Sequence, residues 1–159
     1  MARKKWAGAR WYIGTKTAAL ASETNWTAIE GARAASGSFG KEWQTADATT
    51  MADHFRRNAK TIFDAGQIEL TMLRNMADPG QAALKSACND KTDTPFNFKV
   101  ELDDNPDPSP GDGNPSTFRF RAQVHAFSGR AGGPTNLVEF MARLDLEDEL
   151  LEEDADTGV

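Results

Sequence analysis

The 159-residue sequence is poor in the side chains that carry most catalysis and metal binding. It has two histidines, His54 and His125, and neither lies in a recognised catalytic motif. Its single cysteine, Cys88, cannot form an internal disulfide and lies among small residues of a short expected helix, where buried thiols are usually inert. The sequence therefore predicts no enzyme, no cofactor and no bound metal.

Long apolar runs are also absent. No segment approaches the roughly 18 apolar residues of a membrane-spanning helix, and the N-terminus lacks the apolar stretch of a signal peptide. We therefore expect a protein made in a cytoplasm, with no membrane anchor. Hydrophobic residues make up 39% of the chain, including nine Phe and four Trp, which is enough to fill one core without disulfides.

The sequence has no basic excess outside its start, although its charges are unevenly placed. Eight acidic and no basic residues lie between Asp145 and Asp156, whereas the first ten residues are basic. This pattern predicts a basic N-terminal arm (1–9), a single β domain (10–148) and an acidic, disordered C-terminal tail (149–159). Opposite charges at the two ends favour contact between copies over dedicated nucleic-acid binding.

Clear period-two alternation is present in the segment FRFRAQVHAF, residues 118–127. Apolar side chains occupy the even positions and polar ones the odd positions, which is typical of a half-buried β-strand. Residues 138–146 alternate in the same way, so the two segments predict a hairpin. With a turn near 130–132, Arg119 and Arg121 fall near Arg143 and Asp145. This mixed-charge face does not fit a surface that grips DNA.

Further short strands are expected near 10–15, 25–31, 36–43, 67–75 and 96–102. In the last of these, Asn97, Lys99 and Glu101 alternate with apolar residues and are expected to face outward. Asp78 followed by Pro79 predicts a helix start. Residues 44–65 show no firm periodicity and are interpreted as a long mobile loop with a helical turn near 51–57. Residues 103–116, with four prolines, predict a second loop.

The order of these pieces resembles the major tail tube protein of long-tailed, siphovirus-like bacteriophages and gene transfer particles. The resemblance spans roughly 10–148 and rests on NWTAIEG, DAGQIELTM, DPGQAAL and the FRFRAQVHAF hairpin. It implies a mainly β fold, a sandwich or barrel of about seven or eight strands with one flanking helix and a long inter-strand loop. It also implies a structural virion protein, whose six-copy rings stack into a tube that conducts DNA.

The resemblance implies contacts with further copies, with tape-measure, terminator and distal tail proteins, and non-specifically with passing double-stranded DNA. A wall that lets DNA slide should carry acidic and small polar side chains. The lumen candidates are therefore Glu69, Thr71, Glu139 and Asp145. The resemblance also implies an inter-ring loop, with candidates Thr49, Met51, Asp53, His54, Phe55, Arg56 and Arg57. The candidates for an inter-subunit hairpin face are Arg119, Arg121 and Arg143. The loop 103–116 is expected to join these contacts or decorate the exterior.

Two alternatives remain open from the sequence. One is a tail terminator, baseplate or secretion-type ring subunit, which would form rings without extending into a tube. The other belongs to a different class: a small β-barrel that binds an apolar ligand in a pocket lined by phenylalanines, namely Phe96, Phe98, Phe118 and Phe120.

Overall fold

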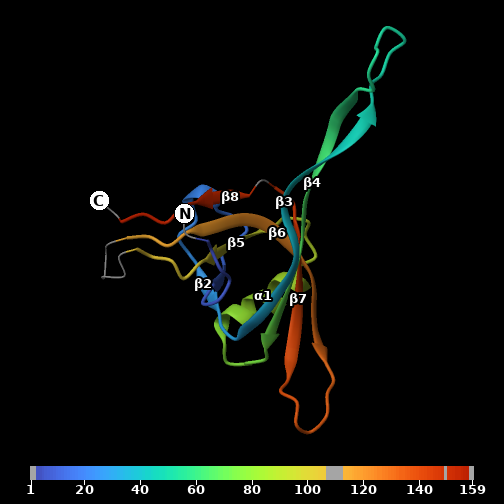
Figure 1. Cartoon of the computed structure of the whole chain (residues 1–159). Coiled ribbons are helices and arrows are strands. Elements are labelled where there is room, and N and C mark those ends of the chain that lie inside the picture. Colours follow the sequence, from blue (N-terminus) through green and yellow to red (C-terminus); the bar gives the residue numbers. More distant parts are fainter. Residues whose placement is uncertain (1–2, 107–112, 149, 158–159) are drawn as a thin grey trace.

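Over the residues that the structure describes, the chain folds into one eight-stranded antiparallel sheet with a single α-helix, which confirms the expected mainly β fold (Figure 1). The computed structural model describes residues 3–106, 113–148 and 150–157. The strands are β1 (Arg10–Ile13), β2 (Thr27–Ile29), β3 (Ala32–Asp47), β4 (Asn58–Leu73), β5 (Phe96–Glu101), β6 (Thr117–Arg130), β7 (Glu139–Leu146) and β8 (Leu151–Glu153). They pair in the order β2-β1-β5-β6-β7-β4-β3, and β8 pairs with the start of β6. A short 3-10 helix, η1, spans Leu20–Ser22.

The sheet curves around one hydrophobic core. Alternate side chains of β4, β6 and β7 point into this core, and Leu70, Ala122 and Leu144 are completely buried. Phe98 and Phe120 stack at its centre, with ring centroids 5.6 Å apart. The period-two pattern of the sequence therefore marks the inner face of the sheet correctly.

Helix α1 (Pro79–Asn89) covers part of the core and begins where the sequence predicts. The Asp78 carboxylate caps it by accepting a hydrogen bond of 2.8 Å from the Gln81 backbone N–H. The fully buried Gln81 side chain fixes the helix to its neighbours. Its amide nitrogen donates to the carbonyl oxygens of Glu30 and Leu73, at 2.8 Å each. These hydrogen bonds fix the helix to the end of β4 and to the turn between β2 and β3.

Most of the segment expected to be a mobile loop, 44–65, is regular β-structure instead. Strands β3 and β4 form a long hairpin that leaves the body, and only residues 48–57 form its tip (Figure 1). We call residues 40–65 the arm. The loop prediction was wrong because both faces of the arm are largely exposed. A strand with no buried face has no reason to alternate apolar and polar residues.

The arm joins the body at a pair of glycines. Gly37 and Gly66 both have positive φ angles, +108° and +97°. A Cβ on Gly37 would lie 2.1 Å from the Gln67 carbonyl oxygen, and one on Gly66 would lie 2.1 Å from the Ser38 carbonyl oxygen. The strand register also shifts between Phe39 and Glu42. Glycine is therefore required on both strands where the hairpin changes direction.

The β6–β7 hairpin is confirmed, but its turn lies further along the chain than 130–132. Strand β6 continues to Arg130, which pairs with Glu139, and residues 131–138 make the connection. Even residues oppose even ones up to Val124, as expected, and a bulge at His125 then shifts the register by one. The shift places Phe127 opposite Ala142 on the core face. The glycines at 129, 132 and 133 had suggested the earlier turn position, near 130–132.

Asn97 was expected to face outward but is completely buried. The segment between β1 and β2 covers it, and its amide donates to the Ala18 carbonyl (2.9 Å) and to the Glu23 carboxylate (2.8 Å). Burial would raise the pKa of Glu23, but hydrogen bonds from Thr15 and Asn97 outweigh this effect and lower the pKa to about 2. Glu23 is therefore an ionised, hydrogen-bonded group beneath this covering segment.

Described segments near both chain ends, around Trp6 and residues 151–153, contact the body. The Trp6 ring stacks on Trp11 at 6.3 Å and meets Phe39 edge-on at 6.0 Å, so this part of the basic arm is docked. In the segment expected to be a disordered acidic tail, residues 151–153 form β8 against β6. Residues 107–112 of the proline-rich loop lie outside the described residues, while Asp104, before them, accepts a hydrogen bond of 2.7 Å from the Ser116 backbone N–H.

Candidate assembly surface

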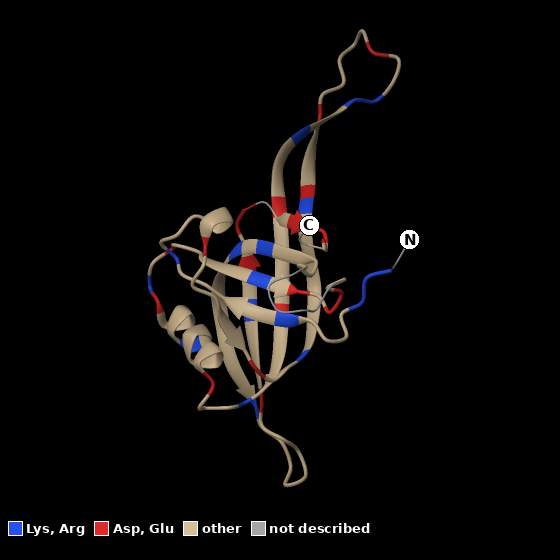
Figure 2. Ribbon diagram, turned by 90° about the vertical axis from the view of Figure 1, so that its left-hand side faces the viewer, with Lys and Arg blue, Asp and Glu red and all other residues tan. Residues whose placement is uncertain are grey.

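Strands β3, β4, β7 and β6 form a broad sheet, which Figure 2 shows from the side of the core, and its other face points away from the core. The opposite face of the same strands is covered by the chain's own core, helix and remaining strands. Small side chains line the β3 row of the open face, and mixed polar and charged ones line the other rows. The side chains of β3, β4 and β7 on this face are Ala34, Ser36, Ser38, Gln67, Glu69, Thr71, Met141, Arg143 and Asp145.

Charges on this open face are matched across strands. Glu69 of β4 stands directly opposite Arg143 of β7, and Gln67 stands opposite Asp145. The Gln67 amide donates to the Asp145 carboxylate at 2.6 Å, and His125 also contacts that carboxylate. Opposite charges facing each other on neighbouring strands stabilise a sheet and reduce the net field of its surface. The face is consequently mixed in charge.

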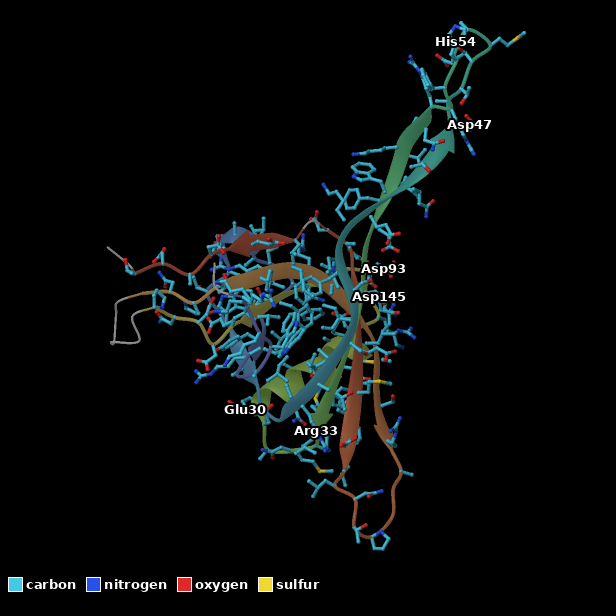
Figure 3. All side chains as sticks on the ribbon, viewed as in Figure 1. Glu30, Arg33, Asp47, His54, Asp93 and Asp145 are labelled. Atoms are coloured by element: carbon cyan, nitrogen blue, oxygen red, sulfur yellow. The ribbon has the colours of Figure 1, made fainter. Side chains whose placement is uncertain are left out.

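Three of the four candidate lumen residues, Glu69, Thr71 and Asp145, lie together on this face, within adjacent strands. Glu139 is the first residue of β7, and its carboxylate forms an ion pair with Arg33, which Figure 3 labels. Arg143 shares the face with Glu69. The sequence had assigned these two residues to different surfaces, but the register places them on one.

The other two candidate arginines differ in environment. The Arg119 guanidinium lies 3.7 Å from the Glu153 carboxylate of β8 and donates to the Ala21 carbonyl at 3.4 Å, so the chain itself partly covers it. Arg121 is also half-buried. Within the described ranges, the Nε atoms of Arg119, Arg121 and Arg143 are buried and lack a hydrogen-bond partner.

The open sheet has two edges that no described strand occupies. One is β3, the last strand in the sheet order. The other is the second half of β6: strand β5 pairs with β6 only up to Ala122, which leaves Val124–Arg130 unpaired on that side among the described residues. Free edges template pairing with further strands. Sequence patterning could not reveal these edges, because they follow from strand order.

The candidate inter-ring residues are brought together at the arm tip, residues 48–57. The Asp53 carboxylate accepts from the Thr50 backbone N–H at 2.8 Å and lies 3.1 Å from the Arg57 guanidinium. The Thr49 hydroxyl accepts from the Arg57 backbone N–H at 2.9 Å. Met51 and Phe55 are almost fully exposed, while His54 lies at the far end of the arm (Figure 3). Arg56 is exposed and lies 4.0 Å from Asp47.

The arm carries its own small cluster of aromatic and basic side chains. Trp43 and Phe63 meet edge to face with ring centroids 5.3 Å apart. The Lys41 ammonium lies 4.7 Å from the Phe63 ring centre, and that of Lys60 lies 5.5 Å from the Trp43 ring centre. Such contacts hold two strands together where no core supports them.

The ligand-binding alternative finds no support at two of the four phenylalanines it needs, Phe98 and Phe120. Phe98 and Phe120 are buried and stack directly on each other, so they fill the core instead of lining a cavity. No group of three or more potential metal ligands occurs among residues 3–106, 113–148 and 150–157. Within the same ranges, no helix is long and apolar enough to cross a membrane.

Comparison with solved structures identifies the fold. The chain matches the SPP1 tail tube with a TM-score of 0.66 and 12% identity, over 96% of this chain and 80% of that one. The tail of an empty gene transfer agent particle matches with a TM-score of 0.60 and 14% identity, over 95% of this chain and 99% of that one. The sheath/tube terminator of PVC, an extracellular contractile injection system, matches with a TM-score of 0.65 and 11% identity, over 96% of this chain and 98% of that one. No protein-family model and no curated protein matches the sequence. The chain has the fold of tail tube proteins.

Proposed function

We propose that this protein is a structural virion subunit that self-assembles into rings, which stack into a tail tube for DNA passage. The observation that carries the proposal is the open sheet β3-β4-β7-β6 with a free edge on each side. A soluble protein usually protects such edges, because they promote association. Pairing the β3 edge of one copy with the β6 edge of the next removes both.

Strand direction supports this closure. Successive strands in the order β3, β4, β7, β6 are antiparallel, so β3 and β6 run in opposite directions. When copies are related by rotation about an axis along the strands, β3 of one copy is antiparallel to β6 of its neighbour. The antiparallel alternation then continues from copy to copy without a break, and the repeated contact closes into a ring. Six copies per ring is part of the proposal, by similarity to the tail tube fold.

The same closure orients the open face. The body covers the core side of these strands, so the uncovered side faces the ring axis. Glu69, Thr71 and Asp145 would then line the lumen together with Arg143. Cross-strand pairing of these charges leaves few free cations to hold phosphates, which favours sliding of DNA. A tube structure that places Glu69 and Asp145 away from the axis would contradict this assignment.

In this role the protein's partners are further copies, the tape-measure, terminator and distal tail proteins, and passing double-stranded DNA. Its place is the virion tail, after synthesis in the cytoplasm of the bacterial host. The likeness to a tube terminator favours one second candidate, a ring that caps a tube without extending it. Both candidates use the same ring contact and differ in whether rings stack.

Electron microscopy of the purified protein, dilute and then concentrated, tests the proposal. Hollow tubes are expected for the tube subunit and single rings for a terminator. Hydrogen exchange on subunits and assemblies then tests the edges: amides of Ala32–Phe39 in β3 and Val124–Arg130 in β6 should gain protection on assembly. The central strand β4 serves as the control, because its body half is paired on both sides in a single chain. Persistent monomers, or assembly without protection at either edge, would refute it.

A further inference from the structure

A cleft of about 270 Å³ lies along the free edge of β3. Its lining comes from residues 32–35 of β3, from the N-terminal segment and β1 (Trp6, Ala9 and Trp11), and from Leu70. Neighbouring residues of a strand point to opposite faces, so a cleft that touches four in succession lies beside the strand and not over one face. An apolar cavity of about 150 Å³ is enough to hold a benzene ring. The cleft therefore has room for an aromatic side chain.

The free half of β6, at the other edge of the open sheet, carries one aromatic side chain on its core face, Phe127. The Phe127 and Phe140 rings lie side by side with centroids 5.2 Å apart, and the Arg74 guanidinium lies 5.4 Å from the centre of the Phe127 ring. These contacts hold the ring in place. It is nevertheless only half-buried, because β5 pairs with β6 no further than Ala122. Phe127 is thus an apolar side chain fixed at an open edge.

The strand register places Phe127 and the cleft at the same level of the sheet. Phe127 pairs with Ala142, and Ala142 pairs with Leu70. Leu70 in turn pairs with Ala35, which lines the cleft. We call the contact between β6 of one copy and β3 of the next the seam. When the sheet continues across the seam without an offset along the strands, Phe127 stands beside Ala35 of the next copy, at the cleft.

The joint of the arm favours this alignment. The row of paired residues that starts at Gly37, where the arm leaves the body, ends at Val124 of β6 (Figure 1). Val124 lies just beyond the part of β6 that β5 occupies. A shift that brought Gly37 beside Ala122 would push β3 of the next copy against β5. The opposite shift would leave the end of β6 without a partner.

The other face of the seam presents no obstacle to close approach. In the same alignment, Ser36 of β3 lies opposite Ala126 of β6, and Ala34 lies opposite Ser128. All four side chains are small and uncharged, so the two strands can approach to the ordinary spacing of ~4.8 Å without contact between like charges.

We propose that the Phe127 ring of one copy packs into the cleft along β3 of the next copy, against Trp6, Trp11 and Ala35. This proposal rests on the proposed function, because it names the side-chain contact that closes the ring. Aromatic rings packed together gain stability beyond that of the area they bury. Each copy supplies one Phe127 ring and one cleft at opposite edges, so a closed ring of copies leaves no cleft empty. Trp6, which belongs to the basic N-terminal arm, becomes part of the ring contact.

An exchange of side-chain size across the seam tests the contact. Ala35→Phe fills the cleft before the neighbour's ring can enter, and Phe127→Ala leaves the cleft empty. Each variant alone should reduce the fraction of protein in rings at least ~10-fold in sedimentation and electron microscopy. A 1:1 mixture should assemble again, because in an alternating ring each filled cleft faces a copy that lacks the Phe127 ring. Phe127→Ala mixed with Ser36→Phe, a change on the other face of β3, is the matched control and should not recover.

Recovery by mixing separates a contact between copies from an effect inside one chain. Within a chain, Ala35 and Phe127 are three strand spacings apart, roughly 14 Å, so mixing cannot repair damage to the single fold. Urea unfolding of the free subunits shows whether each variant is folded. A mixture of folded variants that stays unassembled, or a single variant that assembles like the wild type, would overturn the proposal.

Cross-linking tests the alignment with the Phe127 ring in place. In a Cys88→Ser background, rings of chains with Ser36→Cys and Ala126→Cys should give a ladder of linked chains on oxidation, since opposed Cβ atoms of paired strands lie about 4.5–5.5 Å apart. Chains with Ser38→Cys and Ser128→Cys, which the same alignment places out of register, should not. Rings that give no ladder with the first pair, or a ladder with the second, refute the seam contact but leave the ring intact. A wild-type protein that makes neither rings nor tubes refutes the function, and the seam contact with it.

Discussion

The body and the arm are made of the same antiparallel strands but are stabilised differently. In the body, β4 is paired on both sides and its inner side chains, such as Leu70 and Met72, are fully buried. In the arm, the same strand has one partner and no core. A two-stranded ribbon is marginally stable in water. The arm is therefore held together by local contacts such as that of Trp43 with Phe63.

The largest difference in the free energy of unfolding is expected between substitutions of two phenylalanines, one in the body and one in the arm. Phe120→Ala removes a ring stacked in the core and should lower the free energy of unfolding by about 3–5 kcal/mol, because it leaves a cavity. Phe55→Ala at the arm tip should change it by less than ~0.5 kcal/mol. Urea unfolding of both variants measures the difference. Equal losses would mean that the arm belongs to the cooperative core.

Two glutamines extend the comparison to polar groups. Gln81→Leu leaves the Asn75 backbone N–H and the Glu30 and Leu73 carbonyls without their partner, so we expect a loss of at least about 2 kcal/mol. Gln44→Leu, on the exposed arm, should have little effect on the same unfolding measurement. An unfolding free energy unchanged by Gln81→Leu would show that water can replace these three hydrogen bonds.

Acid is expected to lower the stability of the body by protonating the Glu23 carboxylate. Its pKa of about 2 lies below the ordinary 4.5, so its ionised form stabilises the folded state above about pH 4.5, and this stabilisation is lost as the pH falls toward 2. Glu23→Gln should cost roughly 1.5–3 kcal/mol at pH 7, and the difference from the wild type should shrink with acid. Unfolding at several pH values measures it, with Glu152→Gln as an exposed control. A difference that stays constant with pH would contradict this account.

The smallest global effect is expected in the arm stem. Trp43→Ala should leave the unfolding of the body within ~0.5 kcal/mol of the wild type. Locally, loss of an aromatic pair worth about 1 kcal/mol should speed hydrogen exchange of nearby arm amides about fivefold. Peptide-level exchange measures this change against unchanged protection in β7. Slower or unchanged exchange in the arm would show that Trp43 does not hold the strands together.

The sequence predicts those parts of the fold whose local pattern and final environment agree. Asp78 and Pro79 mark the helix start, and the alternating strands with one buried face are found where expected. The arm escapes prediction because neither of its faces is buried. Asn97 misleads because the segment that covers it comes from elsewhere in the chain.

The candidate site shows the same division. Glu69, Thr71, Glu139 and Asp145 are predicted lumen candidates from their positions in alternating strands, and this stays a prediction. Their sharing of a face with Arg143 depends on the β4–β7 register, and the two free edges depend on strand order. None of these features has a local sequence pattern, since each arises from pairing between distant segments.

The glycine pair where the arm joins the body has a geometric consequence for any long assembly. Beyond Gly37 and Gly66 the paired strands of the arm extend for roughly 25 Å, about eight residues at ~3.3 Å each, before the tip begins. Over that lever, a few degrees of bend at the joint move the tip by ångströms around the axis. At both glycines a Cβ atom would lie only 2.1 Å from a carbonyl oxygen, so no other residue fits there. The two positions therefore fix the angle of the arm as well as the local turn. In a stack they would set the helical twist from one layer to the next, and so the pitch of the whole filament.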